Sequence, residues 1–88
     1  MNKKKFLVRL IRSQKNVKYR DFIVILTAFG FRNDRSGGSH NIYVHDDIPD
    51  IVNTQNENGE AKPYQIKQFL RLVEMYKLKL GKEDKDDD

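Results

Sequence analysis

The sequence predicts an α+β fold, with a three-stranded antiparallel sheet, two helices on one face of it and an extra helix at the amino terminus. Two observations predict this. Apolar residues recur at helical spacing near both ends of the chain, and between about residues 31 and 55 they alternate with polar ones. Helices that flank a run of short strands are typical of α+β domains, in which the helices cover one side of the sheet.

Three segments have the pattern of amphipathic helices. Residues 3–12 place an apolar side, which includes Phe6 and Leu10, opposite a basic one. The second helix carries the cleanest stripe, at i, i+3, i+4 and i+7: Phe22, Ile25, Leu26 and Phe29. We expect Gly30 to end it as a left-handed cap, with Phe31 folding back on the last turn. Pro63 opens the third helix, whose predicted buried stripe is Ile66, Phe69, Leu70 and Val73.

The predicted strands cover residues 31–35, 40–45 and 51–55. Gly37 and Gly38 permit positive φ in the first turn, residues 46–47 form the second turn, and residues 56–60 form a polar loop. In the second strand, we expect Ile42 and Val44 to face the helices. Asn41, Tyr43 and His45 would then face away from them.

The length of 88 residues fits a single domain. We assign residues 1–81 to it, with 1–16 as the additional basic helix and 17–81 as the core, and residues 82–88 to a disordered acidic tail. The formal charge is +4, but the tail contributes −3, so residues 1–81 carry +7. A basic domain of this size favours polyanionic partners such as nucleic acids.

Composition also excludes several classes of protein. The chain has no cysteine and only two histidines, so we expect neither a disulfide framework nor a metal, and we expect no cofactor. The apolar run after the amino-terminal lysines is interrupted by Arg9 and Arg12 before it reaches the length of a signal peptide. Because no stretch is long enough to cross a membrane, we expect a cytoplasmic protein without membrane contact.

The candidate chemistry lies around Gly38, Ser39 and His40, which follow Arg35 and lead into the second strand. Histidine is the one side chain that takes up and releases a proton near neutral pH without help from its surroundings. Acid–base catalysis here therefore depends on His40, on His45 or on a strongly perturbed residue. His45 is five positions further on, so strand alternation places the two rings on opposite faces of the sheet.

From about residue 17 to residue 80 the chain resembles the HicA family of bacterial toxins. The matching features are the helix that ends in Phe29, Gly30 and Phe31, the Arg-x-x-Gly-Ser-His run from Arg35 to His40, and Lys62 with Pro63 before the last helix. The order and spacing of these motifs make the resemblance more specific than Gly-Ser-His alone. It implies a fold like that of double-stranded-RNA-binding domains.

The resemblance also implies a function: the toxin of a type II toxin–antitoxin system, a metal-independent endoribonuclease that cleaves messenger RNA and inhibits translation. His40 would be its single catalytic histidine, and Arg35, Gly38, Ser39 and Lys62 would bind RNA phosphates. The implied partner is a HicB-like antitoxin that masks the His40 surface. Two positions depart from the family pattern, because Asn41 stands where a second histidine is common and Gly37 where a basic residue is common.

Other interpretations remain open from the sequence. A non-catalytic RNA-binding module of the same fold, or a small structural or DNA-binding protein, would also be basic. Tyr43 can stack on a base or cover the sheet, and Tyr64 and Gln65 can help an anion bind at the start of the last helix or remain ordinary surface residues. The amino-terminal helix can pack on the core, mediate homo-oligomerisation or contact RNA.

Overall fold

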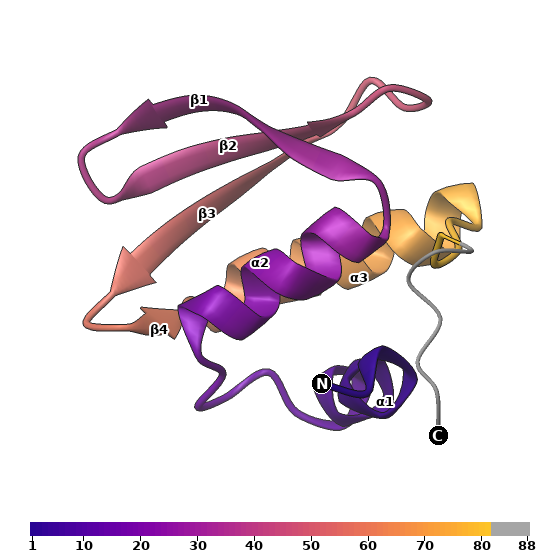
Figure 1. The fold of residues 1–88 in the computed structure, drawn as a ribbon, viewed down its shortest axis with the longest axis horizontal. Helices are drawn as coiled ribbons and strands as arrows, with labels where there is room; N and C mark the ends of the chain where they lie inside the picture. The colour runs from indigo at the N-terminus through magenta and orange to yellow at the C-terminus, as the bar shows by residue number, and fades with distance from the viewer. Residues whose placement is uncertain (82–88) are drawn as a thin grey trace.

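The computed structural model describes residues 1–81, and the predicted acidic tail, residues 82–88, lies outside them (Figure 1). The elements occur in the order α1 (Lys3–Arg12), α2 (Tyr19–Ala28), β1 (Phe31–Gly37), β2 (His40–His45), β3 (Ile51–Glu57), β4 (Glu60–Ala61) and α3 (Pro63–Tyr76). The α+β class is confirmed. The bounds of α1 and β2 agree with the predicted ones.

The helix boundaries follow local chemistry. The side chain of Asn2 caps α1 by accepting a hydrogen bond from Lys5 N at 3.0 Å. Gly30, with φ of +95°, follows the end of α2 in the left-handed conformation that the sequence predicts. Pro63 occupies the first turn of α3, also as predicted, and Lys77 ends that helix in the left-handed conformation.

The sheet contains four strands in the order β1-β2-β3-β4, where the sequence analysis expects three. The difference lies in residues 56–60, the predicted polar loop. There β3 continues to Glu57 and pairs with the two-residue β4 through a tight turn at Asn58 and Gly59, whose φ angles are +54° and +89°. Asn-Gly suits such a turn because both central residues must adopt positive φ.

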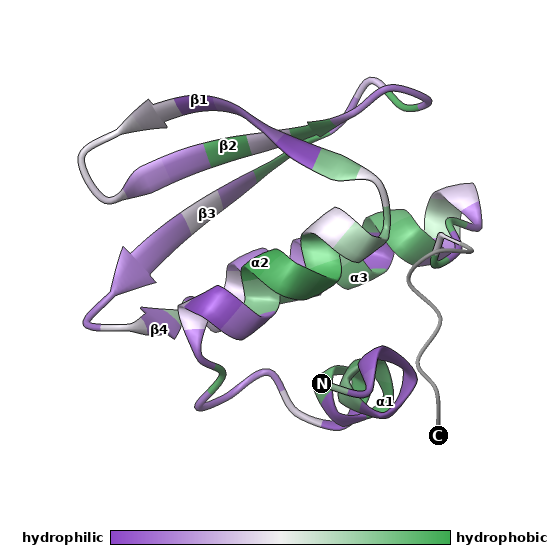
Figure 2. Cartoon of the chain, viewed as in Figure 1, coloured by the Kyte–Doolittle hydropathy of each residue, from purple (hydrophilic) through white to green (hydrophobic). Residues whose placement is uncertain are grey.

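The chain forms three layers, with the sheet above α2 and α3 and with α1 below them (Figure 1). Phe69 of α3 occupies the centre of the core, where its ring contacts those of Phe22, Phe29 and Phe31 edge-on at centroid distances of 5.5–6.0 Å. Phe6 and Leu10 of α1 are buried in the same cluster. The amino-terminal helix therefore packs on the core. Apolar residues concentrate in α2 and α3, whereas the ends of β2 and β3 near the hairpin turns are hydrophilic (Figure 2).

The expected facing of β2 is wrong, because Tyr43 belongs to the core and Ile42 and Val44 lie on the opposite face. The register explains why. Phe31 is held in the core directly after α2 and pairs with His45, and residues paired across antiparallel strands point to the same side. Alternation along β2 then turns Tyr43 and Asn41 toward the helices and leaves His40 on the outer face.

Candidate functional site

No helix of residues 1–81 covers the outer face of the sheet (Figure 1), and the pairing of β2 places the predicted catalytic histidine on this face. His40 begins β2, is exposed to solvent, and lies between Gly37 on β1 and Gln55 on β3. Since Gly37 has no side chain, space remains open on that side of the ring. Within residues 1–81 no group forms a hydrogen bond to the His40 ring, so both ring nitrogens are available to a ligand.

A β-bulge brings Arg35 to the same face. The pairing of β1 with β2 changes register between Asn33, opposite Tyr43, and Arg35, opposite Ile42, so that Asp34 is an extra residue in β1. Without this insertion Arg35 would share the inward side of Asn33 and Tyr43. Bulges commonly redirect a side chain in this way. Arg35 thus lies diagonally across from His40, and within residues 1–81 it forms one ion pair, an exposed one with the neighbouring Asp34 at 3.5 Å.

The turn between β1 and β2 consists of Gly38 and Ser39. Gly38 has φ of +59°, whereas Gly37 remains part of the strand, so only the second of the two glycines uses the predicted positive φ. The Ser39 carbonyl accepts a hydrogen bond from Asn56 N at 3.1 Å. This bond ties the first hairpin to the second one and limits the movement of the backbone next to His40.

Lys62 lies further across the sheet. It directly follows Ala61, the last residue of β4, which pairs with Asn56 of β3. Continuing that antiparallel register places the Lys62 backbone beside Gln55. Two strand spacings, about 10 Å, then separate the backbones of Lys62 and His40. The first turn of α3 starts here, and α3 lies under the sheet (Figure 1). The predicted residues thus form a row along one face rather than a closed pocket.

A network of polar side chains supports this row from below. Tyr19 Oη lies 2.7 Å from Thr54 Oγ1 and accepts a hydrogen bond from Asn41 Nδ2 at 2.8 Å. Thr54 Oγ1 donates to the Asn41 carbonyl at 2.9 Å. Asn41, the position where the family often has histidine, is therefore a packing residue that fixes the backbone following His40.

His45 and Tyr43 do not belong to the outer face. The His45 ring packs edge-on against Phe31 at 5.1 Å, and its Nδ1 accepts a hydrogen bond from Asp47 N at 3.1 Å. Tyr43 is buried, and burial raises the pKa of its hydroxyl; the nearby Tyr19 adds to the shift, and a hydrogen bond with Asn33 opposes it. This position fits the interpretation in which Tyr43 covers the sheet, and it does not fit the one in which Tyr43 stacks on an RNA base.

A polar depression of about 500 Å³ near the turns was not predicted from the sequence. It lies between the start of α2 and the β3–β4 hairpin and is lined by Lys18, Tyr19, Arg20, Asn56, Asn58, Gly59 and Glu60. In the sequence, Lys18 and Arg20 are followed by the acidic Asp21, so this segment does not stand out as a basic cluster that would indicate a binding site. Only the folded chain brings them to the same end of the sheet as Ser39.

Within residues 1–81, no three His, Asp or Glu side chains are grouped in a way that could hold a metal ion. No helix in that part of the chain is long and apolar enough to cross a membrane. The fold and the face together define a small basic α+β domain with a histidine on an open sheet surface.

Comparison with known families identifies the domain more closely. Residues 19–75 match the family model of the HicA toxin of bacterial toxin–antitoxin systems, and the chain belongs to this family. The membership implies a HicB-type antitoxin as partner. No curated protein and no solved structure matches the chain. The matched segment begins at the first residue of α2, so α1 lies outside it.

Proposed function

We propose that this protein is a metal-independent endoribonuclease that cleaves messenger RNA in the cytoplasm and so inhibits translation, with His40 as its single catalytic histidine. The observation that carries the proposal is the bulge in β1, which directs Arg35 to the open face that bears His40. Cleavage beside a ribose needs a proton acceptor for the 2′-hydroxyl and a cation for the neighbouring phosphate, and this uncovered surface carries both. The sheet with two helices beneath it also supports a fold like that of double-stranded-RNA-binding domains.

The proposed reaction uses the RNA as its own nucleophile. The His40 imidazole takes the proton of a ribose 2′-hydroxyl, whose oxygen attacks the adjacent phosphorus while the bond from phosphorus to the 5′-oxygen breaks. Water supplies the proton for the leaving oxygen, since His45 lies on the other face. Products are a 2′,3′-cyclic phosphate and a 5′-hydroxyl. One positioned base contributes roughly 10²- to 10⁴-fold, so the enzyme should be slow.

The remaining residues of the row act on the RNA backbone. Arg35 holds a phosphate next to the reacting ribose, and Lys62, whose backbone lies two strand spacings or about 10 Å from that of His40, holds a second phosphate. Gly38 allows the tight turn, and the Ser39 hydroxyl provides a further donor beside it. A HicB-like antitoxin that covers this face would block the RNA and keep the toxin silent.

The test is cleavage of a labelled RNA oligonucleotide in the presence of a chelator. We expect cleavage by the wild type, a cyclic phosphate on the product, and loss of activity in His40→Ala. Asn53→Ala is the matched control, because Asn53 is an exposed residue of the same face, opposite Ile42. An RNA with a 2′-deoxy sugar at the cleaved position should resist. Equal cleavage by His40→Ala and the wild type would refute the assignment.

A second candidate is a non-catalytic RNA-binding module. The His40 ring has no hydrogen-bonding partner within residues 1–81, whereas catalytic bases are usually oriented by another group. This candidate predicts that the wild type and His40→Ala bind the oligonucleotide equally and that neither cleaves it. The same two proteins therefore separate the two functions.

A further inference from the structure

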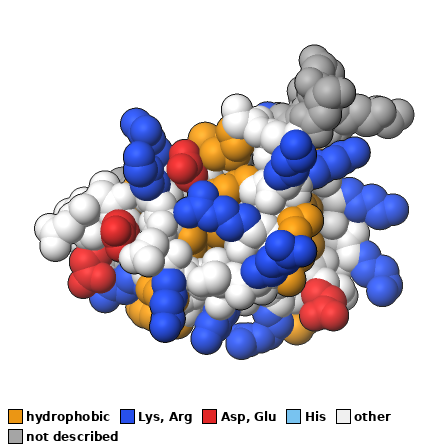
Figure 3. Space-filling view, turned by 90° about the horizontal axis from the view of Figure 1, so that it is seen from below, with side chains coloured by type: hydrophobic (Ala, Val, Ile, Leu, Met, Phe, Trp, Pro, Cys, Tyr) orange, Lys and Arg blue, Asp and Glu red, His pale blue; other side chains and the backbone are white. Residues whose placement is uncertain are grey.

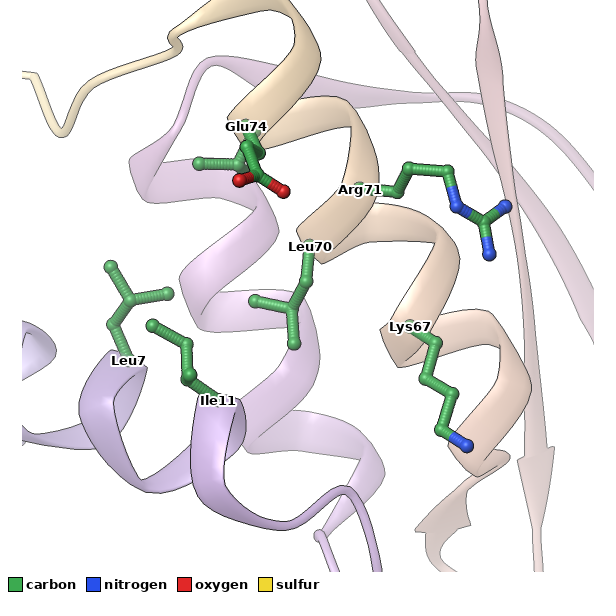
Figure 4. A pocket seen from close by; sticks show the side chains of 7 residues that line it. Leu7, Ile11, Lys67, Leu70, Arg71 and Glu74 are labelled. Atoms are coloured by element: carbon green, nitrogen blue, oxygen red, sulfur yellow. The ribbon is translucent and has the colours of Figure 1, made fainter.

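The opposite side of the molecule carries an apolar groove between α1 and α3. One cavity of about 500 Å³ has the lining residues Leu7, Ile11, Lys67, Leu70, Arg71, Val73 and Glu74 (Figure 4). A second, of about 360 Å³, shares Leu7 and Val73 with it and continues past Phe29 toward Leu78 and Leu80. The shared residues make the two cavities one groove, with an aliphatic floor.

The apolar side chains that form the floor are only partly buried. Ile11 of α1 is 61% exposed although it lines the first cavity. Leu7, Leu70 and Val73 are only partly buried and pack at the margin of the core. A groove of this kind can accept the apolar side of an amphipathic helix, whose anchors recur at i, i+3, i+4 and i+7.

The rim of the groove is cationic. Lys67 and Arg71 stand on consecutive turns of α3, and neither has an ion-pair partner within residues 1–81. On the other wall, α1 (Lys3–Arg12) contains five Lys and Arg residues and no Asp or Glu. Seen from this side, the surface shows Lys and Arg side chains around apolar patches (Figure 3). Among residues 1–81, Glu74 is the one acidic residue that lines either cavity.

We propose that this groove binds an amphipathic helix of a partner protein whose polar side is acidic. Charge complementarity selects this occupant. A second copy of the chain would bring the same cationic rim against itself, and residues 82–88 are acidic but contain no apolar side chain to fill the floor. Because the groove lies below α2 and α3, its occupant leaves the outer face of the sheet, with His40, uncovered.

The groove extends beyond the part of the chain that matches the family model. One wall is α1, which lies outside the matched residues 19–75. The inference therefore does not depend on the proposed ribonuclease activity. RNA cleavage should be the same with the groove empty and filled, so the failure of one proposal is distinguishable from the failure of the other.

The probe is a synthetic fluorescent peptide of about four helical turns, with leucine at i, i+3, i+4 and i+7 and glutamate at most other positions. Fluorescence anisotropy with the full chain measures its affinity. Ile11→Ser should weaken binding about ten-fold, whereas Val8→Ser should not, since Val8 is 48% exposed on the same helix but does not line the groove. Arg71→Glu should weaken it similarly, and Lys15→Glu should have little effect.

Other outcomes overturn the proposal. A scrambled peptide of the same composition that binds equally well would indicate charge attraction without the groove, as would an affinity that Ile11→Ser does not change. Sedimentation that shows a dimer lost in Ile11→Ser would assign the groove to a second copy. Binding to phosphatidylglycerol vesicles through Ile11, without peptide binding, would assign it to a membrane surface. Circular dichroism verifies that each variant is folded.

Discussion

The two histidines stand at opposite ends of the same strand and have opposite surroundings. His40 is exposed on the outer face, next to a glycine and without a hydrogen-bonding partner within residues 1–81. His45 faces the helices, with its ring against Phe31 and its Nδ1 bonded to Asp47 N. The two histidines are five positions apart on an alternating strand, so their rings lie on opposite faces of the sheet. The face on which each ring lies therefore decides which of them is free for chemistry.

The largest expected effect comes from exchanging the two rings for alanine in turn. His40→Ala should lower RNA cleavage by roughly 10²- to 10⁴-fold and leave the melting temperature unchanged. His45→Ala should retain cleavage but lose about 1–2 kcal/mol of stability, because the contact with Phe31 disappears. Cleavage kinetics and thermal unfolding of the same preparations measure both. The comparison fails if His45→Ala is the variant that loses activity.

Gly30→Ala tests how tightly the His45 side is packed. An added Cβ would lie 2.9 Å from His45 Nε2, and φ of +95° disfavours any L side chain. We expect a loss of about 1–3 kcal/mol in urea unfolding. Gly37→Ala is the control at the His40 end, where nothing lies within 4 Å of the new Cβ. Combining Gly30→Ala with His45→Ala should reduce the cost, and additive costs would argue against the contact.

Tyr19→Phe removes the hydroxyl that joins Asn41 to Thr54 beneath the His40 end of β2. The expected cost is about 1 kcal/mol, because the partly buried Asn41 amide loses its acceptor. Tyr64→Phe should cost much less, because this tyrosine is 63% exposed and its hydroxyl accepts only one long hydrogen bond, from Gln65 Nε2 at 3.5 Å. Denaturant unfolding compares the two. Equal stability of both variants would show that the network does not support the strand.

Arg35→Ala should weaken RNA binding without affecting the fold, since its ion pair with Asp34 is exposed. Losing one phosphate contact should reduce the slope of log affinity against log salt by about 0.7. Arg32 is the matched control. It lies on the outer face opposite Val44, near the His45 end, and pairs with Asp46 at 3.1 Å. If Arg32→Ala changes the slope as much as Arg35→Ala, RNA covers the whole face instead of the His40 end.

The smallest effect concerns alkaline pH. Burial raises the pKa of Tyr43 above its ordinary value of 10.0, so the folded state favours the neutral phenol. The stabilisation is complete below that ordinary value and is lost as pH rises through the higher pKa of the folded state. Urea unfolding at about pH 9 to 11 should show a weaker decline for Tyr43→Phe than for the wild type. An unchanged decline would exclude Tyr43 as its source.

Elements with strong local signals were predictable from the sequence. The helix at residues 3–12 follows from its helical periodicity, and the strand at residues 40–45 follows from its alternation and from the two glycines that precede it. Glycine at position 30 and proline at position 63 marked helix ends for stereochemical reasons. The short β4 could also have been predicted, because Asn58-Gly59 is typical of a two-residue hairpin turn. Residues 56–60 were instead predicted to form a polar loop.

Features that depend on pairing between distant residues were not predictable. Alternation shows that Ile42 and Tyr43 face opposite ways, but it does not say which of them faces the helices. That choice depends on Phe31 pairing with His45, and the side of Arg35 depends on the bulge at Asp34. The role of His40 and of the phosphate-binding residues around it remains a prediction, which the fold makes testable.

The bulge has a second consequence, for how other proteins can approach. β1 is an outer strand of the sheet, and its free backbone edge would otherwise invite a visiting strand to extend the sheet. Asp34 interrupts the regular spacing of that edge and, together with Arg32 and Arg35, makes it charged. Addition of a strand at this edge is therefore disfavoured, and a protein that bound this end of the sheet would have to contact its outer face instead.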